Sequence, residues 1–227
     1  MMETDRLIER LAEASGSVRP LARPWRRTAI WLAVAAAYVA LVVLVMTPRS
    51  DLAEKFVDAR FMVELLSALA TGIGAGYAAF ATTIPGYDRR VVLLPVLPLS
   101  IWLMSLGQGC LSSFAQTGSF GPGFKIDLFC FPAIVLVGII PAVAIVIMLR
   151  RGAPLVPYLT AALGGLAAAG IGSFGLRLFH TQDASLMILA WQFGTVMVLT
   201  CLAGAVGRRF FNWPAVLRGT RRIAGQS

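Results

Sequence analysis

The chain has 227 residues, of which 58% are hydrophobic and only 14% are charged. Soluble domains carry about 25% charged residues, so this composition argues against a soluble enzyme or binding module and is typical of a polytopic membrane protein. The formal net charge of +9 is in the range of nucleic-acid-binding proteins. In a membrane protein, however, basic residues more often mark the cytoplasmic face.

The N-terminal residues 3–14 have the pattern of a short amphipathic helix. Leu7, Ile8 and Leu11 form a narrow apolar stripe, and charged residues fill most of the remaining face. A helix of this length is marginal on its own in water. We therefore expect it to lie on a membrane surface or in the groove of a partner protein.

The charge of this helix favours a protein partner. Between Glu3 and Glu13 there are four acidic residues and two arginines, whereas helices on the inner leaflet are normally basic because its lipids are anionic. An acidic amphipathic helix fits an apolar groove with a basic rim, which DNA-binding proteins present because they neutralise phosphates. The alternative is a frayed tail that only orients the first span.

A proline-containing linker follows the predicted helix. Pro20 and Pro24 favour an extended, polyproline-like tether. Such a tether would lay Val18 and Leu21 along a partner as a second contact.

Six apolar stretches of about 20 residues, the length of a membrane-spanning helix, occupy the rest of the chain. They cover residues 28–46, 61–84, 91–113, 126–149, 153–179 and 185–207. We predict an all-α protein with three parts: a cytoplasmic N-terminal segment (1–27), a six-helix transmembrane domain (28–207) and a basic cytoplasmic tail (208–227).

The spans carry signals of close packing. Small residues four apart, at Gly72 and Gly76 and at Gly164, Ala168 and Gly172, predict close helix contacts. Four prolines inside the third and fourth spans predict kinks, as in ordinary bundles or in transporters: Pro95, Pro98, Pro132 and Pro141. Tryptophans near the predicted boundaries are expected in interfacial belts: Trp25, Trp31, Trp102 and Trp213.

The distribution of basic residues predicts the orientation. Fifteen lysines and arginines lie in the N-terminal segment, the second and fourth loops and the tail, against five on the other side. The positive-inside rule then places both termini in the cytoplasm. The basic excess is explained by this topology, and no direct contact with nucleic acid is needed.

Several polar residues converge on the outer side in this topology. The candidates for sensing a signal are Glu64, Cys110, Asp127, Cys130, His180 and Asp183. Ionisable groups inside a membrane are costly and usually have partners and often a role. For Glu64 a simpler explanation is its place near a helix N-terminus, where the dipole favours a carboxylate.

The cysteines leave three interpretations open. Cys110 and Cys130 flank a loop of 19 residues (111–129) that would face an oxidising compartment, so a reversible disulfide would shift one span against another. Alternatively they are small apolar residues in the packing. With His180 and Asp127 they would offer ligands for a thiophilic metal, although the spacing is not diagnostic and no metal is assigned.

A series of motifs along the chain resembles one family. These are Asp5-x-Leu7-Ile8-x-x-Leu11, then Val18-Arg19-Pro20-Leu21, "ARFMVELLSAL" (59–69), "LGQGCL" (106–111), "RRGAPLVP" (150–157) and "FHTQDASLMILAWQFG" (179–194). In this order, and with six spans, they resemble the NrsF-type membrane anti-sigma factors.

The resemblance implies that the chain holds an extracytoplasmic-function (ECF) sigma factor at the bacterial inner membrane and releases it on an envelope, redox or metal signal. The sigma-binding residues are then expected in the N-terminal segment: Asp5, Leu7, Ile8, Leu11, Val18, Arg19, Pro20 and Leu21. The family pattern has a cysteine after the histidine of the last outer loop, where this chain has Thr181. Cys130 therefore lacks its usual mate, and Cys110 is the remaining outer candidate.

Two other classes of function compete with this one. A small transporter or channel would use the glycines and prolines for gating and Glu64 or Asp127 for ion coupling, but the sequence shows no midplane charge and no inverted repeat. A membrane enzyme is disfavoured because His180 is the single histidine and no nucleophile–base pair is evident. We expect no cofactor, and the sequence does not indicate an oligomeric state.

Overall fold

The structure, a computed structural model, describes residues 2–14, 21–117, 130–152 and 156–180, and within them every regular element is a helix. The elements are α1 (Met2–Ala14), α2 (Pro24–Met46), α3 (Leu52–Lys55), α4 (Ala59–Ala81), η1 (Arg89–Leu93), α5 (Val96–Thr117), α6 (Cys130–Arg150) and α7 (Pro157–Phe179). Five stretches, in α2, α4, η1–α5, α6 and α7, are long and apolar enough to cross a membrane. The predicted helical fold is confirmed for this part of the chain. The sixth predicted span (185–207) and the tail (208–227) lie outside it.

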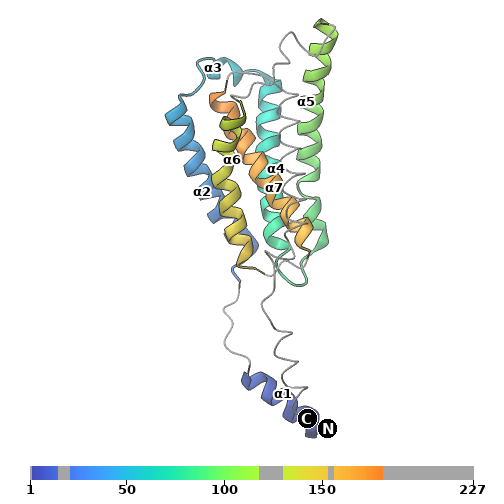
Figure 1. The fold of residues 1–227 in the computed structure, drawn as a ribbon. Coiled ribbons are helices and arrows are strands. Elements are labelled where there is room, and N and C mark those ends of the chain that lie inside the picture. Colours follow the sequence, from blue (N-terminus) through green and yellow to red (C-terminus); the bar gives the residue numbers. More distant parts are fainter. Residues whose placement is uncertain (1, 15–20, 118–129, 153–155, 181–227) are drawn as a thin grey trace.

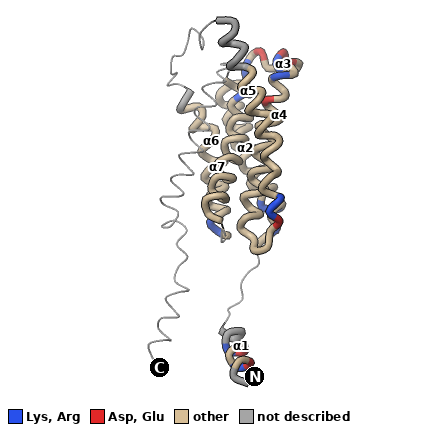
Figure 2. Tube along the Cα trace, turned by 90° about the vertical axis from the view of Figure 1, so that its right-hand side faces the viewer, with Lys and Arg blue, Asp and Glu red and all other residues tan. Residues whose placement is uncertain are grey.

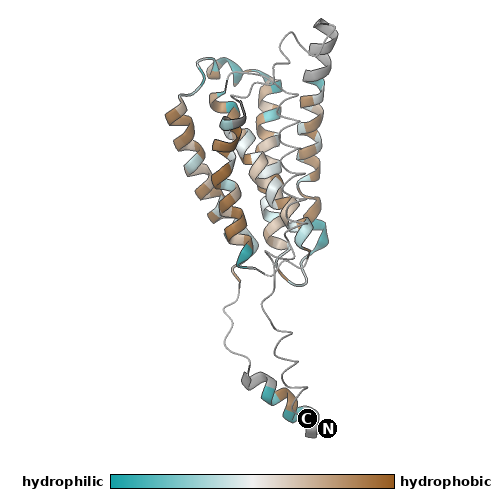
Figure 3. Ribbon diagram, in the orientation of Figure 1, coloured by the Kyte–Doolittle hydropathy of each residue, from teal (hydrophilic) through white to brown (hydrophobic). Residues whose placement is uncertain are grey.

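The antiparallel pair α4 and α7 forms the centre of the bundle (Figure 1). Helices α2 and α6 pack on one side of this pair, and α5 packs on α4 from the other side. In α4 and α7, 56% of the span residues are buried, against 22% in each of the other three spans. The central pair is paler in hydropathy than the outer helices (Figure 3), so the most apolar side chains of the bundle lie on its outer helices.

Glycines allow the central helices to touch. A Cβ atom added at Gly170 of α7 would lie 2.7 Å from the carbonyl oxygen of Ala68 and the nitrogen of Gly72 in α4. At Gly175, an added Cβ would lie 2.7 Å from Val39 and 2.8 Å from Val137, where α2, α6 and α7 meet. The sequence predicted close packing at Gly72, but the tight contacts at Gly170 and Gly175 were outside the predicted ridges.

The prediction of four proline kinks is wrong for three of the prolines. Pro95 precedes α5, while Pro98 and Pro132 each lie in the first turn of a helix. Backbone N–H groups of a first turn have no partner inside the helix, so proline costs little there. Only Pro141 lies in a helix interior within the described spans.

The two ends of the bundle differ in charge. We call residues 1–23 the arm. The end of the bundle at which α2 begins is the arm end, because α1 lies beyond it, and the end with α3 is the distal end (Figures 1 and 2). Among the described residues, the arm end holds seven basic residues and one acidic residue: Arg23, Arg26, Arg27, Arg89, Arg90, Arg150, Arg151 and Asp88. The distal end holds four of each: Arg49, Lys55, Arg60, Arg177, Asp51, Glu54, Asp58 and Glu64.

Candidate functional site

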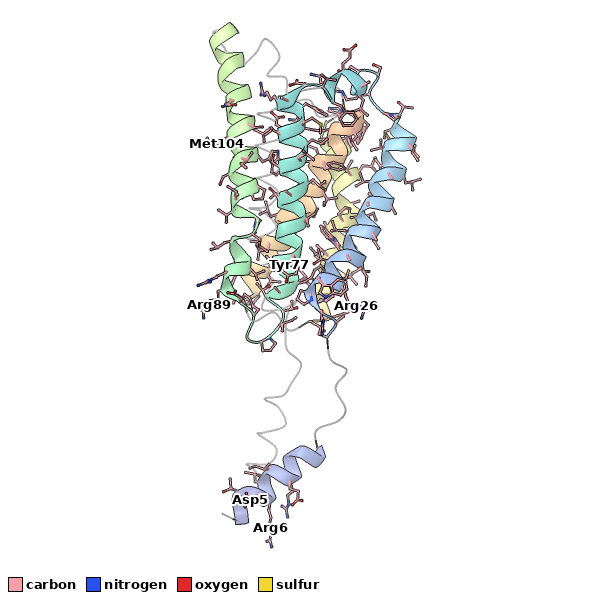
Figure 4. The ribbon with its side chains drawn as sticks, turned by 180° about the vertical axis from the view of Figure 1, so that it is seen from behind. Asp5, Arg6, Arg26, Tyr77, Arg89 and Met104 are labelled. Atoms are coloured by element: carbon pink, nitrogen blue, oxygen red, sulfur yellow. The ribbon has the colours of Figure 1, made fainter. Side chains whose placement is uncertain are left out.

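The arm carries an exposed apolar stripe. Helix α1 confirms the helix predicted over residues 3–14, and the side chains of Leu7 and Ile8 are 58% and 61% exposed. Asp5 and Arg6 are exposed charged residues of the same helix (Figure 4). Leucine and isoleucine at this exposure lose the free energy that burial supplies, so the stripe is a surface that a partner can cover.

Not every predicted partner-binding residue can be placed. Leu21, the last of the predicted linker contacts, is 39% exposed. Leu11 belongs to α1, but its side chain is not described, and Val18, Arg19 and Pro20 lie outside the described residues. Their contacts with a partner therefore stay predictions.

Helix α2 begins closer to the arm than the sequence predicted. Pro24 occupies its first turn, and the backbone N–H groups of Arg26 and Arg27 donate to the carbonyl of Arg23, at 3.1 and 3.2 Å. Proline is favoured in a first turn because its φ is already helical. Both arginines, which the sequence placed ahead of the span, are therefore part of α2.

Arg27 joins three helices at the arm end. Its side chain is 5% exposed, and Nη1 donates to Oγ1 of Thr83 at 2.8 Å. Nη2 donates to the carbonyl of Met148 in the last turn of α6, and the guanidinium lies 4.6 Å from the ring centroid of Phe80 in α4. We call these four residues the Arg27 cluster. Thr83, Met148 and Phe80 supply the contacts of the Arg27 guanidinium, which would be costly to bury without partners.

Trp31, one turn further along α2, is fully buried. Its Nε1 donates to the carbonyl of Pro141 at 2.9 Å, and its ring lies where a Cβ added at Gly76 would come within 2.9 Å. The predicted interfacial position of Trp31 is therefore wrong. The glycine on α4 leaves room for the indole, and Trp31 fixes α2 between α4 and α6.

Glu64 is paired inside the distal end. Its carboxylate is 3% exposed and forms an ion pair with Arg177 of α7 and a second with Arg60 at 3.2 Å. The cap of α4 is Asp58, which accepts from the N–H of Arg60 at 2.9 Å, whereas Glu64 lies in the second turn. A helix dipole acts mainly within the first turn, so the ion pair accounts for the burial of Glu64 better than the dipole does.

Arg49 joins this group from the loop after α2. Its guanidinium forms a bidentate ion pair with the carboxylate of Asp51, with N–O distances of 2.6 and 2.7 Å. Its backbone N–H donates to the carbonyl of Leu178 at 3.2 Å. Nη1 of Arg49 donates to the carbonyl of His180 at 3.5 Å. Arg49 thus caps the C-terminal end of α7 and lowers the pKa of Asp51 by hydrogen bonding to its carboxylate.

Phe61 lies between the two arginines. Its ring centroid is 5.7 Å from the guanidinium carbon of Arg49 and 5.8 Å from that of Arg177. We call Arg49, Asp51, Phe61, Glu64 and Arg177 the distal cluster. It connects the α2–α3 loop, α4 and the end of α7 through charge and cation–π contacts.

The remaining sensing candidates are only partly placed. His180 is the C-cap residue of α7, and its backbone N–H donates to the carbonyl of Leu176 at 2.9 Å. Cys110 lies in α5 and Cys130 begins α6, but neither side chain is described, and Asp127 and Asp183 lie outside the described residues. Among the described residues no three His, Cys, Asp or Glu side chains form a metal site. The disulfide and metal hypotheses stay predictions.

Sequence reasoning missed the arginines that organise both clusters. Arg49 and Arg177 were counted only as outer charges, and Arg27 only as an inner one. One available signal was depth: Glu64 and Arg177 lie at similar distances from the outer ends of their predicted spans. An acid and a base at one depth in a membrane are candidates for a pair.

A comparison with known families identifies the chain. The model of the NrsF family, described as negative regulator of sigma F, matches residues 11–213. The chain belongs to the NrsF family. This match confirms the resemblance found in the sequence, and it assigns the chain to a family of regulators of a sigma factor rather than to a class of enzymes. Neither the curated proteins nor the solved structures contain a match.

The family match covers the elements of the bundle but only the end of α1, so Leu7 and Ile8 lie outside it. It begins within α1, at Leu11, and includes α2 to α7. Both the Arg27 cluster and the distal cluster therefore lie inside the matched region.

Proposed function

We propose that this NrsF-family chain is a membrane anti-sigma factor whose arm binds an ECF sigma factor and holds it at the bacterial inner membrane. The single observation that carries the proposal is the exposed Leu7–Ile8 stripe on an acidic helix that precedes the basic end of the bundle in the chain. The family match supplies the class of partner, a sigma factor. The arm supplies a surface of the right chemistry.

The chemistry of the contact follows from the two surfaces. Leu7, Ile8 and Leu11 enter an apolar groove on the sigma factor, and burial of each side chain contributes about 1.5–3 kcal/mol. Asp5 and the other acids of α1 face the basic rim that a DNA-binding protein needs for its phosphate contacts. The linker residues Val18, Arg19, Pro20 and Leu21 extend this contact as a strand-like tether, with less entropy to lose because Pro20 restricts the backbone.

The proposed orientation places the arm end in the cytoplasm. The distribution of charge supports this orientation, because the arm end holds seven arginines and one aspartate whereas the charges at the distal end are balanced. In this orientation residues 1–27 and 208–227 are cytoplasmic, and residues 28–207 form the transmembrane domain with the predicted sixth span. Cysteine-accessibility labelling in intact cells tests the orientation, with Ser17→Cys or Glu54→Cys introduced into a chain whose three native cysteines are replaced by serine. Only Glu54→Cys should react with a membrane-impermeant reagent.

Release of the sigma factor begins, in this proposal, at the distal end. Glu64 and His180 are candidates because both adjoin the arginines of the distal cluster. Cys110, Cys130, Asp127 and Asp183 complete the set of sensing candidates on the basis of the sequence alone. A redox or metal signal at these residues would change how α4, α6 and α7 pack and would reach the arm through the bundle.

Co-purification tests the binding step. The full chain is isolated from membranes with its sigma factor, as the wild type, as Leu7→Glu and as Arg6→Gln. Both variants lower the charge of α1 by one, but Leu7 lies on the apolar stripe and Arg6 on the opposite face. We expect Leu7→Glu to lose the sigma factor and to derepress its promoter, because a charge in an apolar groove costs several kcal/mol. Arg6→Gln should retain it. Normal insertion and retention by a chain lacking residues 1–20 would refute the proposal.

A further inference from the structure

Arg27 is a buried cation, and the topology of the chain does not by itself explain why it is buried. Its neighbour Arg26 is exposed and points away from the bundle (Figure 4), whereas Arg27 is 5% exposed. Two adjacent arginines would be equivalent if their only task were to mark the cytoplasmic face. Their different burial indicates that Arg27 has a separate role.

The bonds of Arg27 are made to groups that need them. The carbonyl of Met148 is among the last four of α6, which have no partner within the helix, and it lies at the negative end of the helix dipole. The hydroxyl of Thr83 donates to the carbonyl of Phe80 at 2.7 Å, so its lone pair accepts from Arg27. Both acceptors are therefore also held by contacts other than Arg27: Thr83 by the Phe80 carbonyl, and Met148 by its place in α6.

Gly152, two residues after the end of α6, lies at the same point. Gly152 lies against Thr83 so closely that an added Cβ would come within 2.8 Å of the Thr83 Cβ atom. The N–H of Gly152 donates to the carbonyl of Leu149 at 2.9 Å, which ends α6. The ends of α4 and α6 thus meet at Thr83, and their separation sets whether Arg27 can reach both acceptors at once.

We propose that Arg27 is a positioning residue that transmits the packing of α4 and α6 to the arm. The arm joins the first turn of α2 at Arg23, and Arg27 holds that turn against Thr83 and Met148. A rearrangement that separates α4 from α6 at the arm end breaks one of these bonds and releases the turn from which the arm extends. The biological part of this inference rests on the proposed function, whereas the coupling of residues 21–30 to the bundle does not.

Hydrogen exchange of the full chain in lipid nanodiscs tests the coupling without a partner. The chains compared are the wild type, Arg27→Gln, Thr83→Val, the double variant and the control Arg26→Gln. We expect exchange in residues 25–30 to become about tenfold faster in Arg27→Gln and in Thr83→Val, because each removes a buried bond to a charged group. The double variant should exchange no faster than Arg27→Gln, since both changes remove the same contact. Arg26→Gln should match the wild type.

Thr83→Val keeps both the size of the side chain and the charge of Arg27, so it remains informative if Arg27→Gln fails to fold. Exchange at the wild-type rate in Thr83→Val and in any folded Arg27→Gln chain would overturn the inference.

Dissociation of the sigma factor that the wild-type chain retains tests the transmission. We expect dissociation about tenfold faster from Arg27→Gln and Thr83→Val, because a mobile exit point lowers the pre-organisation of the arm. Dissociation at the wild-type rate from chains with faster exchange would overturn the role in transmission. Retention by Leu7→Glu would instead refute arm binding, and the exchange result would stand by itself, so the two failures are distinguishable.

Discussion

Glu64 and Arg177 form an ion pair between the two central helices of the bundle. Both side chains are at most 10% exposed, and a second arginine, Arg60, approaches the same carboxylate from the solvent side. Helices α4 and α7 are the most buried spans of the described chain. The ion pair joins one residue of each helix and so fixes how far one helix can slide along the other at the distal end. The threonine pair Thr82–Thr160, with oxygens 2.8 Å apart, does the same at the arm end.

Breaking the Glu64–Arg177 pair should destabilise the bundle strongly. Glu64→Gln removes the buried carboxylate that pairs with Arg177, and the loss of one partner of a buried pair costs about 3–5 kcal/mol. The free energy of unfolding in detergent or bilayers measures this cost. Arg60→Gln is the control, because Arg60 is 44% exposed and its loss should cost less than about 1 kcal/mol. Equal costs for the two variants would contradict the central place of Arg177.

Gly170→Ala should separate α4 from α7. The added methyl group would overlap the backbone of α4 at Ala68 and Gly72. A side chain could relieve such an overlap by changing its rotamer, but backbone atoms cannot. Over-packing of this kind costs about 1–3 kcal/mol. Gly138→Ala in α6 is the matched control, since a Cβ there meets nothing within 4 Å. Thermal unfolding of both variants in one detergent would show whether only Gly170→Ala is destabilised.

Asp51 gives the distal end a dependence on acid pH. Hydrogen bonding from Arg49 lowers the pKa of Asp51 in the folded chain, so its stabilising effect is complete above about pH 5, where Asp is ionised in the unfolded chain as well, and is lost as the pH falls through the folded pKa. The difference in unfolding free energy between the wild type and Asp51→Asn should therefore be constant above about pH 5 and shrink at lower pH. A difference that does not change with pH would show that the Arg49–Asp51 pair contributes nothing.

The sequence predicted the helices well because their signals are local. Apolar stretches of spanning length indicated α2, α4, α5, α6 and α7, and the Leu7–Ile8–Leu11 pattern indicated α1. The boundaries moved by a few residues where prolines start helices, as Pro24 and Pro157 do. A hydropathy pattern does not distinguish a proline that begins a helix from one that interrupts it.

The site could be predicted only in part, because its main contacts join distant segments. Periodicity identified the exposed stripe on α1, since it depends on neighbouring residues alone. No local pattern separates Arg27 from Arg26, because the burial of Arg27 depends on Thr83 and on the end of α6. Likewise, the position of Trp31 in the sequence predicted an interfacial residue. Its burial depends on Gly76 and on the carbonyl of Pro141, which are distant in the sequence.

The most direct test of the account is to locate where a sigma factor contacts the full chain. Hydrogen exchange of the membrane-embedded chain is measured with and without the bound sigma factor. We predict strong protection of residues 3–14, which form the exposed helix α1, and weaker protection of the linker up to Leu21. Protection confined to the arm-end loops near Arg89 and Arg151, with residues 3–14 unchanged, would contradict the account.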